Sequence, residues 1–363
     1  MARHHIKKNG VEMRADAVAD GSPMRDGDMA GSSQDHADMQ RLGKRQELKG
    51  TIWMFLATWI LTIPVVASMA EMASMVPTAG GQYHWARFLN PQAHRSAPLT
   101  TSKVSEFAPP SMQKFLSSIS GWLSALGWQA FIASAAFQSA ATILTVAAMN
   151  FPSYTPQVWQ ITLLTMGVGV FAISVNAFGA KRLPLFEGAI LFFYIIGFFV
   201  ICIPLWVLAP KAPLSAVFGD FENYGGWSSL GGGVIVGQMA ASAAFIGVDS
   251  AVHMSEEVKD ASITVPRMMM GTILLNGVTG FIMVITYVLS IQLVEDQILG
   301  TTSPFPFIGV FATATNSTAG GIGMTVSIIV MTLSMTINAT AAASRQAWSF
   351  ARDGEIYFTK RYH

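Results

Sequence analysis

The sequence predicts an all-α integral membrane protein with about seven transmembrane helices. Two features of the composition indicate this class: 52% of the 363 residues are hydrophobic and only 12% are charged, which is about half the charged share of an ordinary soluble domain. The third observation is the length of the apolar runs, because a helix needs roughly 20 residues to cross the hydrocarbon core of a bilayer. Seven runs meet this requirement, at about 51–75, 118–147, 157–179, 185–208, 232–254, 268–293 and 320–348.

Residues 1–50 differ from the rest of the chain and predict a polar tail of cytoplasmic type. They hold nine Lys or Arg and eight Asp or Glu, whereas the remainder of the chain holds thirteen of each. The tail has no apolar period and no hydrophobic run of signal-peptide length, so we expect it to be disordered. The net charge of +1 gives no basis for binding nucleic acid, and the single cysteine, Cys202, cannot form an internal disulfide. We expect no metal site and no cofactor.

The links between the spans indicate how the chain is oriented, because cytoplasmic loops are enriched in Lys and Arg. Links 76–117, 180–184, 255–267 and 345–363 contain these residues, whereas links 148–156 and 294–319 contain none. With the first set in the cytoplasm, the first span begins outside, although Lys44, Arg45 and Lys49 lie just before it. Either the N-terminus of a seven-helix protein is external, or one helix is missing between Lys49 and Thr51.

Several stretches resemble conserved segments of fungal amino acid/choline permeases, which include GABA and choline transporters. The longest is EMASMVPTAGGQYHW at 71–85, which is similar to the signature that follows the second helix in that family. Further matches occur in the same order as in the family, and the resemblance spans about 51–355. They lie at 120–122 and 127–130 (helix three), 245–249 (the middle of helix six), 253–261 with 265–267 (the following loop), and 344–354 (the end of helix eight).

The resemblance implies a fold of the amino acid-polyamine-organocation superfamily, normally twelve helices with two inverted repeats of five, as in leucine transporters. The seven spans would then be helices two to eight, with helix one and helices nine to twelve absent from this chain. The absence of helix one would fall where the loop charges conflict. The resemblance further implies a permease domain at 51–355, an insertion relative to the family at 86–103, and a short tail at 356–363.

The span at 232–254 corresponds to helix six and is the predicted substrate site. Transporters of this fold bind substrate near the bilayer midplane, where interrupted helices expose backbone groups. Small residues in this span allow local unwinding, although such residues also serve simply to let membrane helices approach closely. Hydrogen-bonding side chains on two other spans are candidates for the same site. The predicted substrate-binding residues are Ala243, Ala244, Phe245 (as an aromatic wall), Ile246, Gly247, Gln129 and Asn338.

Charged residues at the end of this span predict two further features. Asp249 lies within an apolar run, where an ionised carboxylate costs roughly 2.5 to 3.5 kcal/mol, so it should face a polar cavity or a partner. It either couples transport to a proton or cation or is a hydrogen-bonded structural residue. The following charges form either a cytoplasmic gate of ion pairs or a solvated loop, and they are Glu256, Glu257, Lys259 and Arg267.

The sequence therefore predicts ion-coupled transport of an amino acid or a related amine, such as GABA or choline, by alternating access. The expected partners are this small molecule, a coupling proton or cation, and the lipid bilayer of the plasma or vacuolar membrane. A seven-helix receptor and a partial gene product that does not transport are the alternatives. An enzyme is disfavoured because no nucleophile, base and orienting acid recur together, and His84 and His253 lack metal-ligand spacing.

Overall fold

The computed structural model describes residues 48–88, 112–151, 153–218, 229–292, 297–298 and 303–352. The chain divides into two units, 1–45 and 46–363, and all of the described residues lie in the second. The predicted tail lies outside these ranges except for residues 48–50, which are helical. Most of the predicted insertion at 86–103 and all of the tail at 356–363 also lie outside them.

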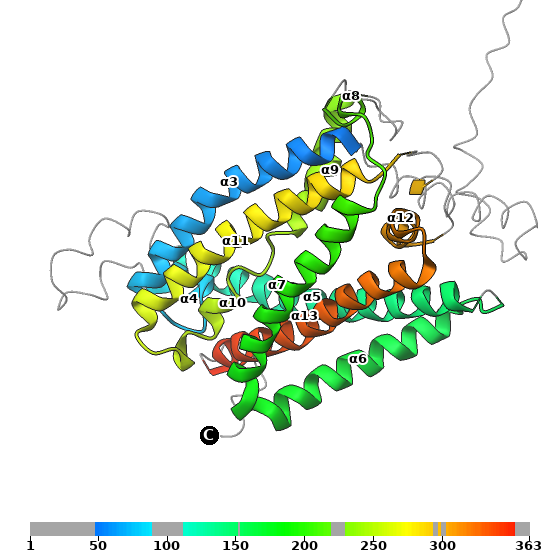
Figure 1. The fold of residues 1–363 in the computed structure, drawn as a ribbon. Helices are drawn as coiled ribbons and strands as arrows, with labels where there is room; N and C mark the ends of the chain where they lie inside the picture. The colour runs from blue at the N-terminus through cyan, green and yellow to red at the C-terminus, as the bar shows by residue number, and fades with distance from the viewer. Residues whose placement is uncertain are drawn as a thin grey trace, which may run out of the picture. The chain divides into compact units, whose positions relative to one another are not determined.

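Every regular element in the described ranges is a helix (Figure 1). The long helices are α3 (Leu48–Met75), α5 (Gln113–Asn150), α6 (Val158–Gly179), α7 (Leu183–Val207), α11 (Ala261–Leu289) and α13 (Thr318–Arg352). The shorter α-helices are α4 (Gln82–Phe88), α8 (Leu214–Phe218), α9 (Leu230–Ala243), α10 (Ser250–His253) and α12 (Pro306–Thr315). Two single 3-10 turns, η1 (Ala180–Arg182) and η2 (Ser255–Glu257), also lie within these ranges, and residues 297–298 are π-helical.

Five stretches of the described chain are long and apolar enough to cross a membrane: Gly50–Met75, Phe115–Asn150, Val158–Val207, Ala261–Leu289 and Thr318–Arg352. The third contains both α6 and α7, which have 22 and 25 residues and are joined by η1, where Lys181 and Arg182 lie. Each of these two helices alone has the length that one crossing needs. The chain is thus an all-α, multi-pass membrane protein.

The apolar run at 232–254 does not form one continuous helix. Helix α9 ends at Ala243 and α10 begins only at Ser250. Between them the amides of Ala244, Phe245 and Ile246 bond to carbonyls three residues back, and Gly247 adopts a φ of +89°. A right-handed helix cannot pass through a residue at positive φ, which glycine adopts without steric cost. The described chain therefore has six of the seven predicted spans as continuous helices and one interrupted helix.

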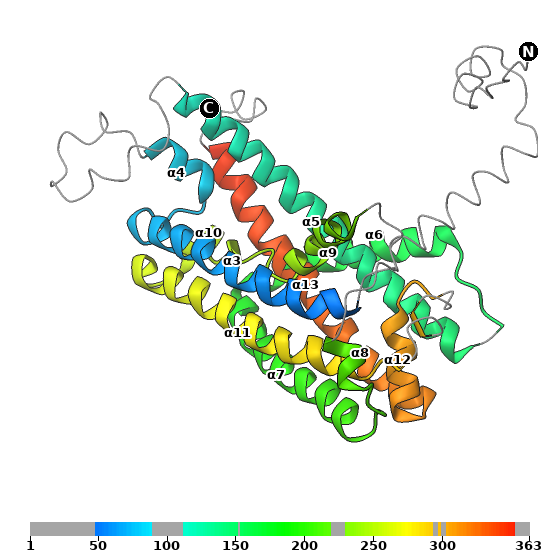
Figure 2. The ribbon, with the colours of Figure 1, turned by 90° about the horizontal axis from the view of Figure 1, so that it is seen from above.

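The helices of the second unit pack in two groups (Figures 1 and 2). The first group consists of α3, α9 and α11, with α3 packed against both of the others; the second consists of α5, α6 and α13. Helix α7 contacts α11 of the first group and α13 of the second. The short α10, which follows the interruption, contacts α11 and α13, so it lies where the two groups meet.

Aromatic side chains of α3 pack against glycines of α11 in the first group. The Trp59 indole covers Gly277, and its Nε1 donates a hydrogen bond to the Ile273 carbonyl at 3.0 Å. A Cβ atom at Gly280 would lie 2.6 Å from Cζ of Phe55, closer than real side chains approach. Small residues let membrane helices come together in this way. The packing holds Phe55 against the segment that follows α9.

Candidate functional site

The helix break, residues 244–249 between α9 and α10, is the main irregular feature inside the helix groups. Phe245 is buried and its ring centroid lies 5.2 Å from that of Phe55. Ala243, Ala244 and Ile246 are exposed. The amides of Gly247 and Val248 donate to no backbone carbonyl of the described residues. The break thus presents one buried aromatic ring and two backbone donors that the helices do not use.

Replacing Gly247 with alanine should destabilise the break. At a φ of +89° a Cβ atom is strained, and such strain costs about 1 to 3 kcal/mol. We expect a lower unfolding temperature for Gly247→Ala in detergent, measured by tryptophan fluorescence. The matched control is Gly231→Ala in α9, where a Cβ atom meets nothing within 4 Å, so it should be neutral or slightly stabilising. Equal unfolding temperatures for the two variants would contradict the assignment of strain to Gly247.

Asp249, at the end of the break, belongs to a buried polar group that we call the His253 cluster. Its Oδ2 accepts a hydrogen bond from Gln82 Nε2 at 2.7 Å and lies 3.6 Å from Nε2 of His253. The fully buried imidazole of His253 contacts two further partners: its Nδ1 lies 2.8 Å from the Ala79 carbonyl oxygen, and its Nε2 accepts from Trp128 Nε1 at 3.1 Å. The cluster therefore joins the segment after α3, helix α5 and helix α10.

The two predicted hydrogen-bonding residues outside the break lie on α5 and α13. Gln129 is exposed, whereas its neighbour Trp128 is buried against His253. Asn338 is half-buried, and its Oδ1 is buried without a hydrogen-bond partner among the described residues. Next to it, the Asn176 amide of α6 donates to the Ile337 carbonyl at 2.9 Å. The substrate-binding roles of Gln129 and Asn338 remain predictions.

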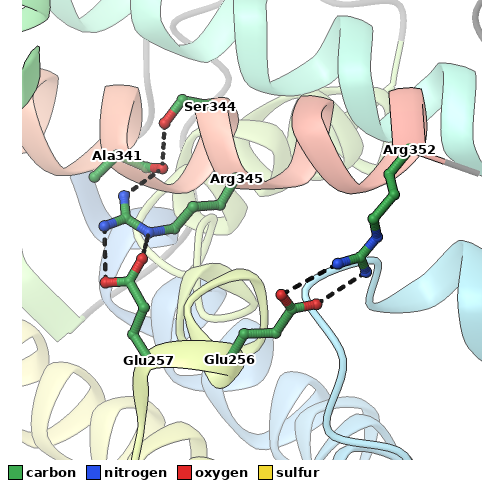
Figure 3. A network of polar contacts seen from close by, with 6 residues as sticks. All are labelled: Glu256, Glu257, Ala341, Ser344, Arg345 and Arg352. Carbon is green, nitrogen blue, oxygen red and sulfur yellow. Dashed lines mark hydrogen bonds and ion pairs between the residues drawn. The ribbon is translucent and has the colours of Figure 1, made fainter. Parts of the chain in front are cut away.

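Two ion pairs join η2 to the last turns of α13 (Figure 3). Glu256 pairs with Arg352 at 3.1 Å. Glu257 pairs with Arg345 through both carboxylate oxygens, one to Nε and the other to Nη2 at 2.9 Å. The structure brings these two predicted gate residues to arginines of α13. The other two, Lys259 and Arg267, are exposed, and no ion pair joins them to an acidic group of the described chain.

The hydrogen bonds from Arg345 hold the pKa of the Glu257 carboxyl below its usual range, against the opposing effect of partial burial. A carboxyl whose pKa is lowered by folding stabilises the fold fully above its unfolded pKa of about 4.3 and loses this contribution as the pH falls through the lower folded value. The Glu257–Arg345 pair should therefore remain intact from neutral pH down to about pH 5.

Charge reversal tests this pair. Glu257→Arg alone places two guanidinium groups together, and Arg345→Glu alone places two carboxylates together, so each should lower the unfolding temperature by a few degrees. The effect is modest, about 1 kcal/mol or less, because the Glu257 side chain is more than half exposed. The double variant restores opposite charges and should recover most of the loss at pH 7. A double variant that loses the sum of both single effects would contradict a direct pair, and Lys259→Glu serves as the control for added charge.

A family model described as amino acid permease matches residues 42–363, most of the chain. The chain belongs to the amino acid permease family. This confirms the predicted family resemblance and agrees with the all-α membrane fold described above. The permease also resembles individual fungal proteins, which differ in the substrates that their names give.

Three of these relatives illustrate the sequence identity and the share of each chain that is matched. A Macrophomina phaseolina protein named as an amino acid/polyamine transporter is 28% identical over 85% of the permease and 64% of its own length. The choline transporter of Saccharomyces cerevisiae is 28% identical over 82% of the permease and 50% of its own length. An amino-acid permease of Schizosaccharomyces pombe is 25% identical over 85% and 53%, respectively. The permease thus spans about half to just under two thirds of the length of the curated relatives it matches.

Sequence reasoning did not assign site roles to five residues that the structure places in these contacts: Gln82, Trp128, His253, Arg345 and Arg352. Two spacings in the sequence indicated that some of these residues could lie on one side of a helix. Asp249 and His253 are four residues apart, and Arg345 and Arg352 are seven apart, so each pair can share a helix face. Their partners lie 88 or more positions away in the sequence, and no local pattern identifies them.

Proposed function

We propose that the permease transports an amino acid or a related amine, such as GABA or choline, by binding it at the helix break. The observation that carries this proposal is the interruption of the helix between Ala243 and Ser250, where the amides of Gly247 and Val248, just before Asp249, donate to no backbone carbonyl of the described residues. In transporters built from inverted repeats, discontinuous helices and unwound backbone hold the charged groups of the substrate. Family membership supports the same kind of cargo.

The chemistry of the break suits a small molecule that carries both charges or one positive charge. Backbone amides attract a carboxylate, and a carboxylate such as Asp249 attracts an ammonium group. The aromatic face of Phe245 would attract an ammonium or quaternary ammonium group through its π electrons, and its buried ring is held in place by Phe55. The remaining candidates for substrate contact are Ala243, Ala244, Ile246, Gln129 and Asn338.

Asp249 is proposed to couple transport to a proton or another cation. Its side chain is 21% exposed, so a cation can reach it, and it directly follows Gly247 and Val248 in the sequence. A cation that binds there and a substrate that binds to the amides would each alter the affinity for the other, which is the thermodynamic requirement for coupling.

The η2–α13 ion pairs are proposed to form the cytoplasmic gate. Glu256 and Glu257 hold the first segment after the break against α13 of the second helix group. Opening on this side requires both pairs to separate, which would leave the two carboxylates available to Lys259 and Arg267. We further propose that this end of the permease faces the cytoplasm and that the permease resides in the plasma or vacuolar membrane.

Uptake measurements test the proposal. The full chain is produced in cells that lack amino acid and choline uptake, and the initial uptake of radiolabelled amino acids, GABA and choline is measured with and without an imposed proton gradient. We expect saturable uptake of at least one of these compounds, increased by the gradient. Uptake equal to that of cells with empty vector, at verified membrane expression, would refute transport by this chain.

A further inference from the structure

The hydrogen bonds of His253 define its protonation state. The Ala79 carbonyl oxygen can only accept a hydrogen bond, so Nδ1 of His253, 2.8 Å away, carries a hydrogen. The Trp128 indole can only donate, so Nε2 of His253, at 3.1 Å, carries none. In this structure His253 is therefore a neutral imidazole, and both of its nitrogens are used.

We propose that His253 is a proton-operated latch between helices α5 and α10. A proton on Nε2 would place an N–H group against the Trp128 N–H group, and two donors cannot bond to each other. The contact with Trp128 must then break, and the new N–H group turns toward Oδ2 of Asp249, only 3.6 Å away. The charged imidazole thus loses its contact with Trp128 of α5 and gains an ion pair with Asp249 of its own segment.

The proton has a route to this buried site. The His253 side chain has no exposed surface, whereas the Asp249 side chain is 21% exposed. One proton passes from water to the Asp249 carboxylate and from there to Nε2, and no other covalent bond changes. Asp249 acts as the relay and His253 as the group whose contacts change.

Release of the latch affects both helix groups. Trp128 lies on α5 of the second group, whereas the Ala79 carbonyl follows α3 of the first group. Protonation thus loosens the junction of the groups on the side where the η2–α13 ion pairs lie. The inference rests on the proposed transport function and makes it more specific, because the coupled cation is then a proton.

Other charged or titratable groups lie on the segments next to the latch. The two glutamates of η2 are paired with the two arginines of α13, so these four groups balance one another. His84, whose Nδ1 lies 2.7 Å from the Thr78 hydroxyl, is the other histidine of the described residues and serves as the control. Among the described residues these groups include Asp249 from the same segment, His84 from α4, Glu256 and Glu257 from η2, Arg345 and Arg352 from α13, Glu187 from α7, and Lys259, Asp260 and Arg267 just before or within the first turns of α11.

The distance between the helix groups tests the latch directly. In a Cys202→Ala background, which removes the single cysteine, spin labels are attached at Leu123→Cys in α5 and Ile263→Cys in α11, both exposed positions. Distance distributions of the full chain in lipid nanodiscs are recorded by pulsed electron resonance at pH 8.0 and 5.5. We expect the ratio of separated to close populations to rise on the order of tenfold at pH 5.5, as the loss of one buried hydrogen bond implies.

Three variants separate the latch from other titrating groups. His253→Gln should abolish the pH response, because the amide oxygen can accept from Trp128 and the amide nitrogen can donate to Ala79 without titrating. Trp128→Phe should increase the separated population already at pH 8.0 and reduce the pH response, and it tests the latch even where His253→Gln does not fold. His84→Gln should respond like the unmodified chain.

An unmodified chain without a pH response would overturn the latch. So would a His253→Gln or Trp128→Phe variant that responds in full, or a His84→Gln variant that does not respond. The measurement requires no substrate, so its outcome is independent of uptake. A chain that shows the His253-dependent response without any uptake would refute the proposed transport and leave the latch standing.

Discussion

Replacing Gly277 with valine should disrupt the packing of α3 on α11. The Trp59 indole occupies the position where the new side chain would lie, so one of the two helices must move. Overpacking of this kind costs about 1 to 3 kcal/mol, and movement also breaks the hydrogen bond from Trp59 to the Ile273 carbonyl, worth about 1 kcal/mol. We expect a large loss of monodisperse protein on size-exclusion chromatography in detergent and a clearly lower unfolding temperature.

The same helix supplies the control for this prediction. A Cβ atom at Gly271 meets nothing within 4 Å, so Gly271→Val should retain nearly the unmodified yield and stability. Combining Gly277→Val with Trp59→Ala makes room for the valine and should recover part of the loss. If Gly271→Val is as damaging as Gly277→Val, the effect is one of helix propensity rather than of the contact with Trp59.

Neutralising Asp249 should have the largest effect on transport. Asp249→Asn preserves the shape of the side chain and can still accept the hydrogen bond from Gln82, but it removes the negative charge and the proton relay. Loss of one partner from a buried charged interaction commonly costs 2 kcal/mol or more, so gradient-driven uptake should fall at least about tenfold. Initial uptake rates, normalised to the amount of protein in the membrane, measure the change.

Asp260 offers a matched carboxylate outside the cluster. It is exposed, makes no side-chain hydrogen bond to the start of α11, and has a φ of 51°, a conformation that asparagine adopts readily. Asp260→Asn should leave uptake unchanged. Uptake by Asp249→Asn that equals the unmodified rate under a proton gradient would remove Asp249 from the coupling mechanism.

The long helices were predictable because one physical constraint defines them. A bilayer requires about 20 apolar residues for each crossing, and the runs that form α3, α5, α6, α7, α11 and α13 satisfy it. Their ends were predicted less well: α11 begins at Ala261 rather than near 268, because the polar and charged residues of its first turns reduce the hydropathy but not the helicity. Hydropathy predicted a span at 232–254 but not the position of its interruption, since an apolar run does not show which glycine adopts a positive φ.

The contacts between distant segments were not predictable from local patterns. The sequence indicated that Asp249 needs a partner, because an isolated carboxylate in an apolar run is costly. It did not indicate which partner, since Gln82 lies 167 positions away. Likewise, the charges of Glu256 and Glu257 predicted either a gate of ion pairs or a solvated loop and named no partner on α13, where Arg352 and Arg345 pair with them. The segments that follow the helix break, α10 and η2, contact α13 of the second group.

The length of α13 has a consequence for the lipid in which the protein works. Its 35 residues extend about 52 Å at 1.5 Å per residue, whereas the hydrocarbon core is about 30 Å thick. The helix must therefore tilt or project beyond the core, and its final turns carry Arg345 and Arg352. A thicker membrane holds such a helix more upright and a thinner one tilts it further, which moves the two guanidinium groups relative to the carboxylates of η2. Through hydrophobic mismatch, the sterol content and acyl-chain length of the membrane would therefore alter the strength of the η2–α13 ion pairs.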